Sequence, residues 1–346
     1  MFEFRMNEKK TLRDHPIFIC GHPKSGTTLL VSLLDSHPQL IVYPNETFFF
    51  RGFIPEMRKR DLDEKITLAQ RYLLHFFDRG LSYPDNQEPM MSSQYQYFMD
   101  YAKSCQVMIQ EVDGNGVRHD GDLLSAAIIA YGRVHGKISP ETIYWVEKTP
   151  YNEHFSEMIF KWWPDARCIH IVRDPRDNYL TYQRKHRGLS AEDYAVGWNS
   201  SLSAGIQNRK YYGDDRYLIL RYEDLTNEPE TSLQKLIVFL GITDDKILRI
   251  PTDDGKPWEG NSQFGDKFQG ISNKPVGRWK RELDDRDVDI IESICADYMK
   301  SEGYEFQKRS KLKSNFILWR WRLKQVPALR GDISKMMKQR FGMLPY

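Results

Sequence analysis

The segment from Gly21 to Thr28 constrains the fold of this chain more than any other. It reads Gly-His-Pro-Lys-Ser-Gly-Thr-Thr and lies between two apolar runs. The run before it, residues 16–20, predicts a buried strand, and the run after it, residues 29–34, predicts a helix. A strand, a glycine-bearing turn and a helix together direct free N–H groups and the positive helix end at an anion. The sequence therefore predicts an oxyanion-binding loop.

The residue types in this loop suit a phosphate-like group. Gly21 and Gly26 lack a Cβ, so the backbone can wrap closely around such a group. Thr27 and Thr28 supply hydroxyl donors in the first helical turn, and Lys24 supplies a mobile positive charge. An ordinary turn would need none of these features.

The spacing differs from that of a nucleotidase P-loop. In GxxxxGK[ST], a lysine follows the second glycine directly and reaches the β- and γ-phosphates. Here Thr27 takes that place and the lysine lies inside the loop, at Lys24. No strand segment ends in a clear Mg²⁺-binding aspartate. We therefore expect phosphate binding without metal-assisted hydrolysis of ATP, and we expect no metal site.

The composition fits a soluble globular protein. Charged residues make up 28% and hydrophobic residues 40% of the chain. Its length of 346 residues is enough for one large or two ordinary domains. The formal net charge of +2 gives no whole-molecule attraction to nucleic acid, so we expect no such partner.

Cysteine usage and the N-terminus indicate a compartment. The four cysteines are scattered and lack the CxxC or Cys/His spacing of a zinc site. Scattered cysteines of this kind favour a reducing compartment. Residues 1–10 lack the apolar region of a signal peptide, and no run of eighteen apolar residues could span a membrane. We therefore expect a cytoplasmic protein.

Strand and helix signals alternate along the rest of the chain. Apolar, β-branched segments predict strands at 39–43, 142–148, 167–172 and 217–220. Periodic apolar segments predict helices at 120–136, 152–163, 175–186, 191–211, 229–240 and 288–299. Such alternation is typical of a parallel sheet with helices on both faces. We expect an α/β fold of three layers, like that of P-loop NTPases.

Three segments fall outside this alternation. Residues 51–136 form a helical insertion, which we expect to be a wall of the binding site. Residues 252–277 are rich in Gly, Asp, Asn, Lys and Pro and predict a mobile loop. Residues 309–346 mix aromatic and basic residues and predict a helical extension beyond a main domain of residues 1–308. The extension packs on its own domain or a partner chain, or lies on a membrane surface.

Five polar side chains lie at or just past the carboxyl ends of the predicted strands. They are Lys24, Glu46, Lys148, Arg173 and Tyr222. In open parallel sheets, ligands bind beyond the carboxyl ends of the strands. We therefore expect these side chains to surround one site.

Residues 23–28, Pro-Lys-Ser-Gly-Thr-Thr, resemble the 5′-phosphosulfate loop of sulfotransferases that use 3′-phosphoadenosine-5′-phosphosulfate (PAPS). The resemblance implies that the 5′ end of this cofactor is bound by Lys24, Ser25, Gly26, Thr27 and Thr28. Three further segments can be compared with the same family.

Residues 173–181 are similar to the family's 3′-phosphate segment, Arg-x-Pro-x-Asp-x-x-x-Ser. A strand-end arginine can hold a phosphate with two hydrogen bonds, and Thr181 keeps the hydroxyl of the family's serine. The resemblance therefore assigns Arg173 and Thr181 to the 3′-phosphate. The alternative is that Arg173 and Asp177 only pair to cap the helix. A purely structural role of this kind suits Arg176 and Asp177 better than it suits Arg173.

Two later segments also match. Residues 221–225 are similar to the family's Tyr-Glu-Asp-Leu, which implies that Tyr222 contacts the adenine; the alternative is a core tyrosine at a strand end. Gly277 belongs to a Gly-x-Trp-Lys run like that of the family segment that folds over the cofactor's phosphates. Ser272 and Lys274 precede it and are assigned to phosphates by position, because the family's usual Arg-Lys-Gly is absent.

Sulfuryl transfer needs in-line placement, a cation on the leaving phosphate and a base for the acceptor proton. The resemblance gives the leaving-group cation to Lys24. Lys148 matches a second lysine of the tyrosylprotein and bacterial branches; alternatively, it pairs with Glu147.

The base departs from the pattern of the cytosolic small-molecule enzymes. Those enzymes carry a histidine after Lys-Thr, where this chain has Pro150. The tyrosylprotein branch places a glutamate just after the second strand, and Glu46 matches it. A carboxylate there can take a hydroxyl proton if burial tunes its pKa. The alternatives are that Glu46 only stabilises a helix N-terminus, and that His119 or His154 is the base.

The resemblance covers about residues 16 to 304 and implies a PAPS-dependent sulfotransferase without a metal requirement. The enzyme would move the sulfuryl group to an acceptor hydroxyl and release 3′-phosphoadenosine-5′-phosphate (PAP). Alternatives are a P-loop kinase or nucleotidase, and a non-catalytic nucleotide-binding scaffold. Protein tyrosine, glycan, lipid and small alcohol all remain open as acceptors, and an oligomer is compatible with the sequence.

Overall fold

The computed structural model describes residues 11–74, 92–307 and 317. Its centre is a five-stranded parallel sheet in the order β2-β3-β1-β4-β5. The strands are β1 (Pro16–Cys20), β2 (Leu40–Val42), β3 (Tyr144–Lys148), β4 (Arg167–Val172) and β5 (Tyr217–Arg221). All five strands expected from the sequence are present, and the α/β fold is confirmed.

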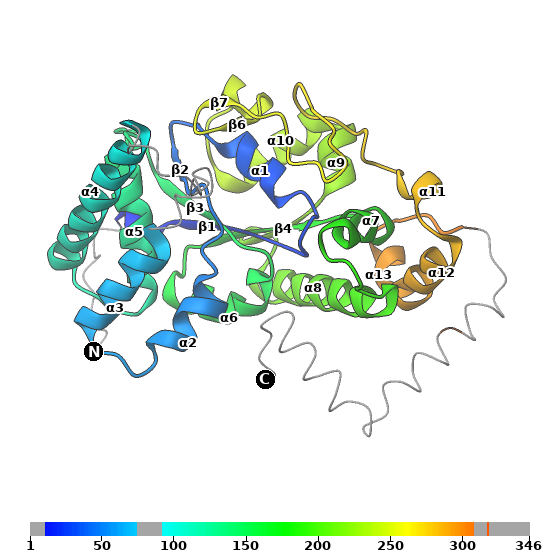
Figure 1. Ribbon diagram of the computed structural model, residues 1–346, viewed down its shortest axis with the longest axis horizontal. Coiled ribbons are helices and arrows are strands. Elements are labelled where there is room, and N and C mark those ends of the chain that lie inside the picture. Colours follow the sequence, from blue (N-terminus) through cyan, green and yellow to red (C-terminus); the bar gives the residue numbers. More distant parts are fainter. Residues whose placement is uncertain (1–10, 75–91, 308–316, 318–346) are drawn as a thin grey trace, which may run out of the picture.

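Each strand divides its side chains between two apolar layers, because successive residues point to opposite faces. Phe18 and Cys20 belong to one layer, Ile17 and Ile19 to the other. The first layer is covered by α5 (Gly121–Val134), α6 (Ser156–Trp162) and α8 (Ala191–Tyr212). The second is covered by α1 (Thr27–Leu34), α9 (Tyr222–Asn227) and α10 (Pro229–Leu240). Figure 1 shows α1, α9 and α10 above the sheet, and α6 and α8 below it.

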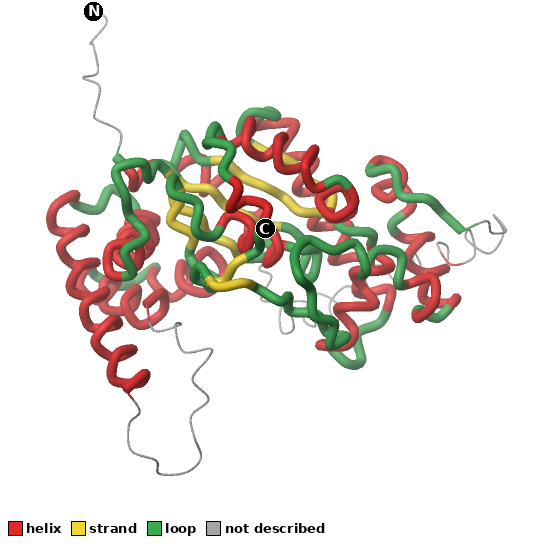
Figure 2. The backbone as a smooth tube through the Cα atoms, turned by 90° about the horizontal axis from the view of Figure 1, so that it is seen from above, coloured by secondary structure: helices red, strands yellow, loops and turns green. Residues whose placement is uncertain are grey.

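The described part of the region 51–136 is mainly helical. It contains α2 (Ile54–Met57), α3 (Leu62–Ala69), α4 (Ser92–Asn115) and α5, with π-helical turns at Phe49–Phe53 and Gln70–Leu74. In both views α3, α4 and α5 gather at one end of the molecule (Figures 1 and 2). Every helix in the described part of the chain is too short or too polar to span a bilayer.

Some boundaries differ from the sequence-based prediction. The helix expected at 288–299 is two helices, α12 (Asp285–Ile294) and α13 (Ala296–Ser301), separated at Cys295. The loop expected at 252–277 contains a short antiparallel pair, β6 (Thr252–Asp253) and β7 (Lys256–Pro257). Of the expected extension 309–346, only Ile317 is described, and it packs against the first apolar layer. The rest of that prediction lies outside the described residues.

A buried ion pair anchors the N-terminal turn Leu12–Asp14 on α5. Nη2 of Arg13 lies 2.8 Å from Oδ2 of Asp122, whose side chain is 1% exposed. The same carboxylate accepts from Nη2 of Arg118 at 2.9 Å and from the Arg118 N–H at 2.7 Å.

Replacement of Asp122 with alanine should lower the free energy of unfolding by about 3–5 kcal/mol, because it leaves Arg13 buried without its partner. Urea unfolding followed by circular dichroism measures this change. The matched control is Glu259→Ala, which removes the exposed partner of Lys267 and should change nothing measurable. Equal stability of the two variants would contradict the anchoring role.

Candidate active site

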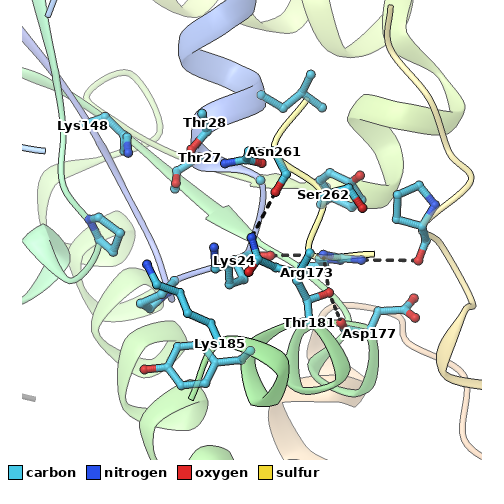
Figure 3. Close-up of a pocket in the computed structure, with 18 of the residues that line it drawn as sticks. Lys24, Thr27, Thr28, Lys148, Arg173, Asp177, Thr181, Lys185, Asn261 and Ser262 are labelled. Atoms are coloured by element: carbon cyan, nitrogen blue, oxygen red, sulfur yellow. Dashed lines mark hydrogen bonds between the residues drawn. The ribbon is translucent and has the colours of Figure 1, made fainter. Parts of the chain in front are cut away.

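A cavity of about 630 Å³ lies at the carboxyl ends of the strands. The structure brings all five side chains expected past the strand ends to its lining: Lys24, Glu46, Lys148, Arg173 and Tyr222. Figure 3 is a close-up of this cavity with many of its lining residues drawn. The parallel direction of all strands is what collects residues so far apart in sequence at one edge.

The loop between β1 and α1 turns at two glycines. Gly21 has φ +125° and Gly26 has φ +104°. A Cβ on Gly26 would lie 2.4 Å from the Tyr222 ring, and one on Gly21 would lie 2.2 Å from the carbonyl oxygen of Ile171. Only glycine fits either position. Helix α1 begins directly afterwards with two threonines that line the cavity, so its free N–H groups stand there.

Other elements support this loop from behind. Ser25 does not line the cavity, because its fully buried hydroxyl accepts from Nδ2 of Asn178 at 2.8 Å. Asn178 lies on α7 (Pro175–Lys185), which follows β4. The Gly21 N–H donates to Oε2 of the buried Glu153 at 3.0 Å. Ser25 therefore acts on the position of the loop.

Arg173 connects this loop to the far side of the cavity. Its Nη1 donates to the Lys24 carbonyl at 3.2 Å and its Nη2 to the Pro275 carbonyl at 3.3 Å. Nη1 also lies 3.5 Å from Oγ1 of Thr181, and the guanidinium lies over the Tyr222 ring, 4.6 Å from its centroid. Nε is buried and has no hydrogen-bond partner among the residues that the structure describes. This donor set, side by side with a hydroxyl, fits a phosphate.

The cap of α7 differs from the alternative considered for Arg173. Asp174 is the capping residue, since its carboxylate accepts the Arg176 N–H at 2.9 Å. Arg176 forms buried pairs with Asp174 and with Glu292, each at 2.6 Å. The idea that Arg173 and Asp177 pair to cap this helix is therefore wrong.

Asp177 instead attaches the late loop to α7. Its carboxylate accepts from the N–H groups of Gly277 at 2.6 Å and Trp279 at 2.8 Å, and burial raises its pKa to about 6. Gly277 and the exposed Lys274 do not contribute to the cavity lining, whereas Ser272 does.

Glu46 and Lys148 form an ion pair, with 2.8 Å between Oε1 and Nζ. Because neighbouring strand residues point to opposite faces, Lys148 reaches the cavity while Glu147 is fully buried beneath it. The alternative that Lys148 pairs with Glu147 is therefore wrong.

Lys24 lies among other positive charges. Burial lowers its pKa, and the charges of Lys185 and Lys148 act in the same direction, whereas the charge of Glu46 opposes them. In Figure 3, Lys185 from the end of α7 and Lys148 from β3 extend toward the same space. A lowered pKa makes the Lys24 ammonium a better proton donor.

Sequence reasoning missed one wall of the cavity, which the late loop supplies. Trp258, Phe264 and Phe268 line it. Arg278 lies over the Phe264 ring at 4.2 Å and pairs with Asp266 at 2.7 Å. The signal for Arg278 was present, since it stands inside the matched Gly-x-Trp-Lys run.

Arg51 was also missed, and it carried no motif. Its guanidinium lies 4.5 Å from the ring centroid of Phe48 and 5.7 Å from that of Tyr151. Within the described residues of the region 51–136, Arg51 alone lines the cavity.

The two fallback bases lie elsewhere. His119 stacks on Trp162, and its Nε2 bonds the Trp162 carbonyl at 3.0 Å. His154 stacks against Tyr151. Neither histidine lines the cavity.

Comparison with known proteins assigns the family. The model of the sulfotransferase family matches residues 16–246, about two thirds of the chain. This chain belongs to the sulfotransferase family. A solved sulfotransferase domain from the curacin biosynthetic pathway is 19% identical and has a TM-score of 0.50. The match covers 84% of this chain and 98% of that domain. That likeness shows the fold.

Curated relatives that cover two thirds or more of this chain include a protein-tyrosine sulfotransferase and a bacterial sulfotransferase, in line with the branches expected from the sequence. The protein-tyrosine sulfotransferase of Drosophila melanogaster is 23% identical over 336 residues, covering 90% of this chain and 58% of that protein. The omega-hydroxy-beta-dihydromenaquinone-9 sulfotransferase of Mycobacterium tuberculosis is 24% identical over 270 residues, covering 67% and 64%. The chain thus spans less than two thirds of the length of these relatives.

Glu223 holds the turn that carries Arg173. Its Oε1 accepts the Asp174 N–H at 2.9 Å, and its Oε2 accepts the Tyr304 hydroxyl at 3.0 Å. Burial raises the pKa of this carboxyl from 4.5 to about 7.

The folded state therefore binds the Glu223 proton more tightly than the unfolded chain does, and stability should fall as pH rises from 4.5 to about 7. Glu223→Gln removes this titration. It should raise the melting temperature by roughly a few degrees at about pH 8 and give no gain near pH 5. Thermal unfolding across this range measures the effect, with the exposed Glu228→Gln as control. The same pH dependence in both variants would contradict the assignment.

Proposed function

We propose that this chain transfers the sulfuryl group of PAPS to an acceptor hydroxyl. The observation that carries the proposal is the hydrogen bond from Arg173 to the Lys24 carbonyl. It means that the family's two nucleotide anchors, the loop after β1 and the arginine after β4, border the same cavity. One nucleotide can then reach both.

The donors around the cavity fit PAPS, which supplies the sulfuryl group and a phosphate leaving group when bound. Lys24 and the first turn of α1, with Gly26, Thr27 and Thr28, would hold the 5′ end, on a loop that Ser25 steadies. The unpartnered buried Nε of Arg173 favours an anion beside Thr181, as the 3′-phosphate would be.

The remaining assignments have unequal support. Tyr222 lines the cavity and lies against both Gly26 and Arg173, a place between the two proposed phosphate sites from which it could contact the adenine. Ser272 lines the cavity and could add a hydroxyl. A direct role for Lys274 or Gly277 would need the late loop to move, because Lys274 is exposed and the Gly277 N–H is bound to Asp177.

For the transfer itself, we assign the acceptor proton to Glu46. Lys148 lies 2.8 Å away, and an adjacent ammonium favours the ionised carboxylate that a base must be. Lys24 stabilises the negative charge that develops on the leaving phosphate, and its lowered pKa favours proton donation there. Positioning and electrostatics supply the rate, as in phosphoryl transfer.

The acceptor class is proposed from the relatives' names. One relative is a protein-tyrosine sulfotransferase and another an omega-hydroxy-beta-dihydromenaquinone-9 sulfotransferase. A hydroxyl on a tyrosine side chain or on a lipid is therefore the first choice to screen. The lining of the cavity includes Glu46 and the aromatic residues Tyr151 and Tyr182, which could meet such a group.

Arg173→Ala should weaken PAP binding by about 10- to 100-fold, because it removes a charge-assisted contact to the 3′-phosphate. Binding of AMP, which lacks that phosphate, should weaken less, because it loses only the support that Arg173 gives to the Lys24 loop. Calorimetry with PAP, AMP and ATP·Mg²⁺ measures all three, and Arg187→Ala, an exposed arginine after α7, is the matched control. Tighter binding of ATP·Mg²⁺ than of PAP would favour a P-loop kinase or nucleotidase instead.

Glu46→Gln should lower the transfer rate by about 10²- to 10⁴-fold while PAP affinity stays the same. Transfer from radiolabelled PAPS to tyrosine peptides, lipid alcohols, glycans and small alcohols measures the rate. Glu56→Gln, on the exposed side of α2, is the control. An unchanged rate would move the base elsewhere, and PAP binding without transfer to any acceptor would indicate a non-catalytic scaffold.

A further inference from the structure

Two pairs of consecutive residues face each other beside the cavity. Glu46 and Thr47 follow β2, and Glu147 and Lys148 end β3, its neighbour in the sheet. On the cavity side, Nζ of Lys148 donates to Oε1 of Glu46 at 2.8 Å. On the buried side, Oγ1 of Thr47 donates to Oε1 of Glu147 at 2.7 Å. Two peptide links and two side-chain bonds therefore close a ring that is half in the cavity and half in the core.

Glu147 is the buried corner of this ring. It is 0% exposed and forms no ion pair with the residues that the structure describes. Its partners are the Thr47 hydroxyl, the Thr149 hydroxyl and Nδ2 of Asn152, the last at 2.8 Å. Burial raises its pKa. A carboxyl in the core without a cation costs stability, so what it contributes is the geometry of its neutral partners.

The chain after Glu46 needs such support. Phe48 has φ +49°, a left-handed conformation that costs a bulky residue about 1–3 kcal/mol. The N–H groups of Thr47 and Phe48 both donate to Oγ1 of Thr149, at 3.0 and 3.3 Å, and the Phe49 N–H donates to Oγ1 of Thr47 at 3.2 Å. Both hydroxyls in turn donate to Glu147. Glu147 therefore fixes three consecutive residues through two threonines.

We propose that Glu147 is a positioning residue for the Glu46–Lys148 pair. It acts through Thr47 and Thr149, which set the path of the chain where it leaves β2 and so the place of the Glu46 carboxylate opposite Lys148. The inference rests on the proposed role of Glu46 as base. The nucleotide anchors stand on β1, β4 and β5, so loosening this ring lowers the rate of transfer and leaves nucleotide binding intact.

The direct test cuts the ring at Thr47, which touches neither cavity nor nucleotide site. Thr47→Val keeps the shape and removes the hydroxyl, and Thr47→Ser restores it. The readout is the ¹⁵N–¹H signal of the Lys148 ammonium, which a stable ion pair protects from exchange with water; Lys148→Arg assigns it and Glu46→Gln abolishes it. We expect the signal in the wild type and in Thr47→Ser, and its loss in Thr47→Val.

Two further measurements separate positioning from a general loss of stability. PAP affinity by calorimetry should be the same in Thr47→Val and the wild type. The rate with the acceptor found in the screen should fall about 10- to 100-fold in Thr47→Val, as for an ångström-scale misplacement, and return in Thr47→Ser. A wild-type signal in Thr47→Val, or no Lys148 signal in the wild type, would overturn the proposal.

Should Thr47→Val fail to fold, hydrogen exchange on the wild type decides. The amides of Thr47, Phe48 and Phe49 should exchange about 100-fold more slowly than in an unstructured peptide, since each donates to the hydroxyl of Thr149 or of Thr47. Exchange of these amides as fast as in an unstructured peptide would contradict the inference. The Lys148 signal and amide exchange need no acceptor. A failure of sulfuryl transfer would therefore appear in the radiolabelled assay, and a failure of positioning would appear in the Lys148 signal and in amide exchange.

Discussion

The hydrogen bond from Arg173 to the backbone of Lys24 is the contact on which the site depends. It ties the turn after β4 to the loop after β1, across a boundary between two strands that are neighbours in the sheet but about 150 residues apart in the chain. Asn178 and Glu153 hold the loop from behind, and its glycines adopt conformations that pack against Tyr222 and against β4. Loop and arginine are therefore one unit, and a phosphate-bearing ligand meets both.

Buried carboxylates hold the other loops of the site in a common manner. Each accepts a backbone N–H from a segment that lines or supports the cavity. The pairs are Glu153 with Gly21, Glu147 with Thr47, Glu223 with Asp174, and Asp177 with Gly277 and Trp279. A carboxylate accepting an N–H makes a stronger bond than a neutral acceptor, and it can reach a loop that no strand pairs with. The desolvation cost appears in the raised pKa values of Asp177 and Glu223.

Much of the fold followed from local sequence signals, and part of the site did as well. The five strands were predictable because strands buried on both faces are continuous apolar runs. The positions of Lys24 and Arg173 followed from motifs attached to strand ends. The pairing of Glu46 with Lys148 did not follow, because the two residues are 102 positions apart in the chain. Their contact depends on which strands pair and on the path of the segment after β2. The break at Cys295 was missed because the apolar pattern runs through it.

The sequence by itself determined where the backbone must turn and which segments are strands or helices, since glycine, proline and apolar periodicity act on the nearest few residues. It also determined the inventory of charges at the strand ends. Only the tertiary structure decided which of these charges meet, that Lys148 faces Glu46 and not Glu147, and that the late loop adds Trp258, Phe264 and Arg278 to the cavity wall. Ion pairs and cavity walls depend on distances between segments far apart in the chain, and those distances are set by how the sheet and its helices pack together.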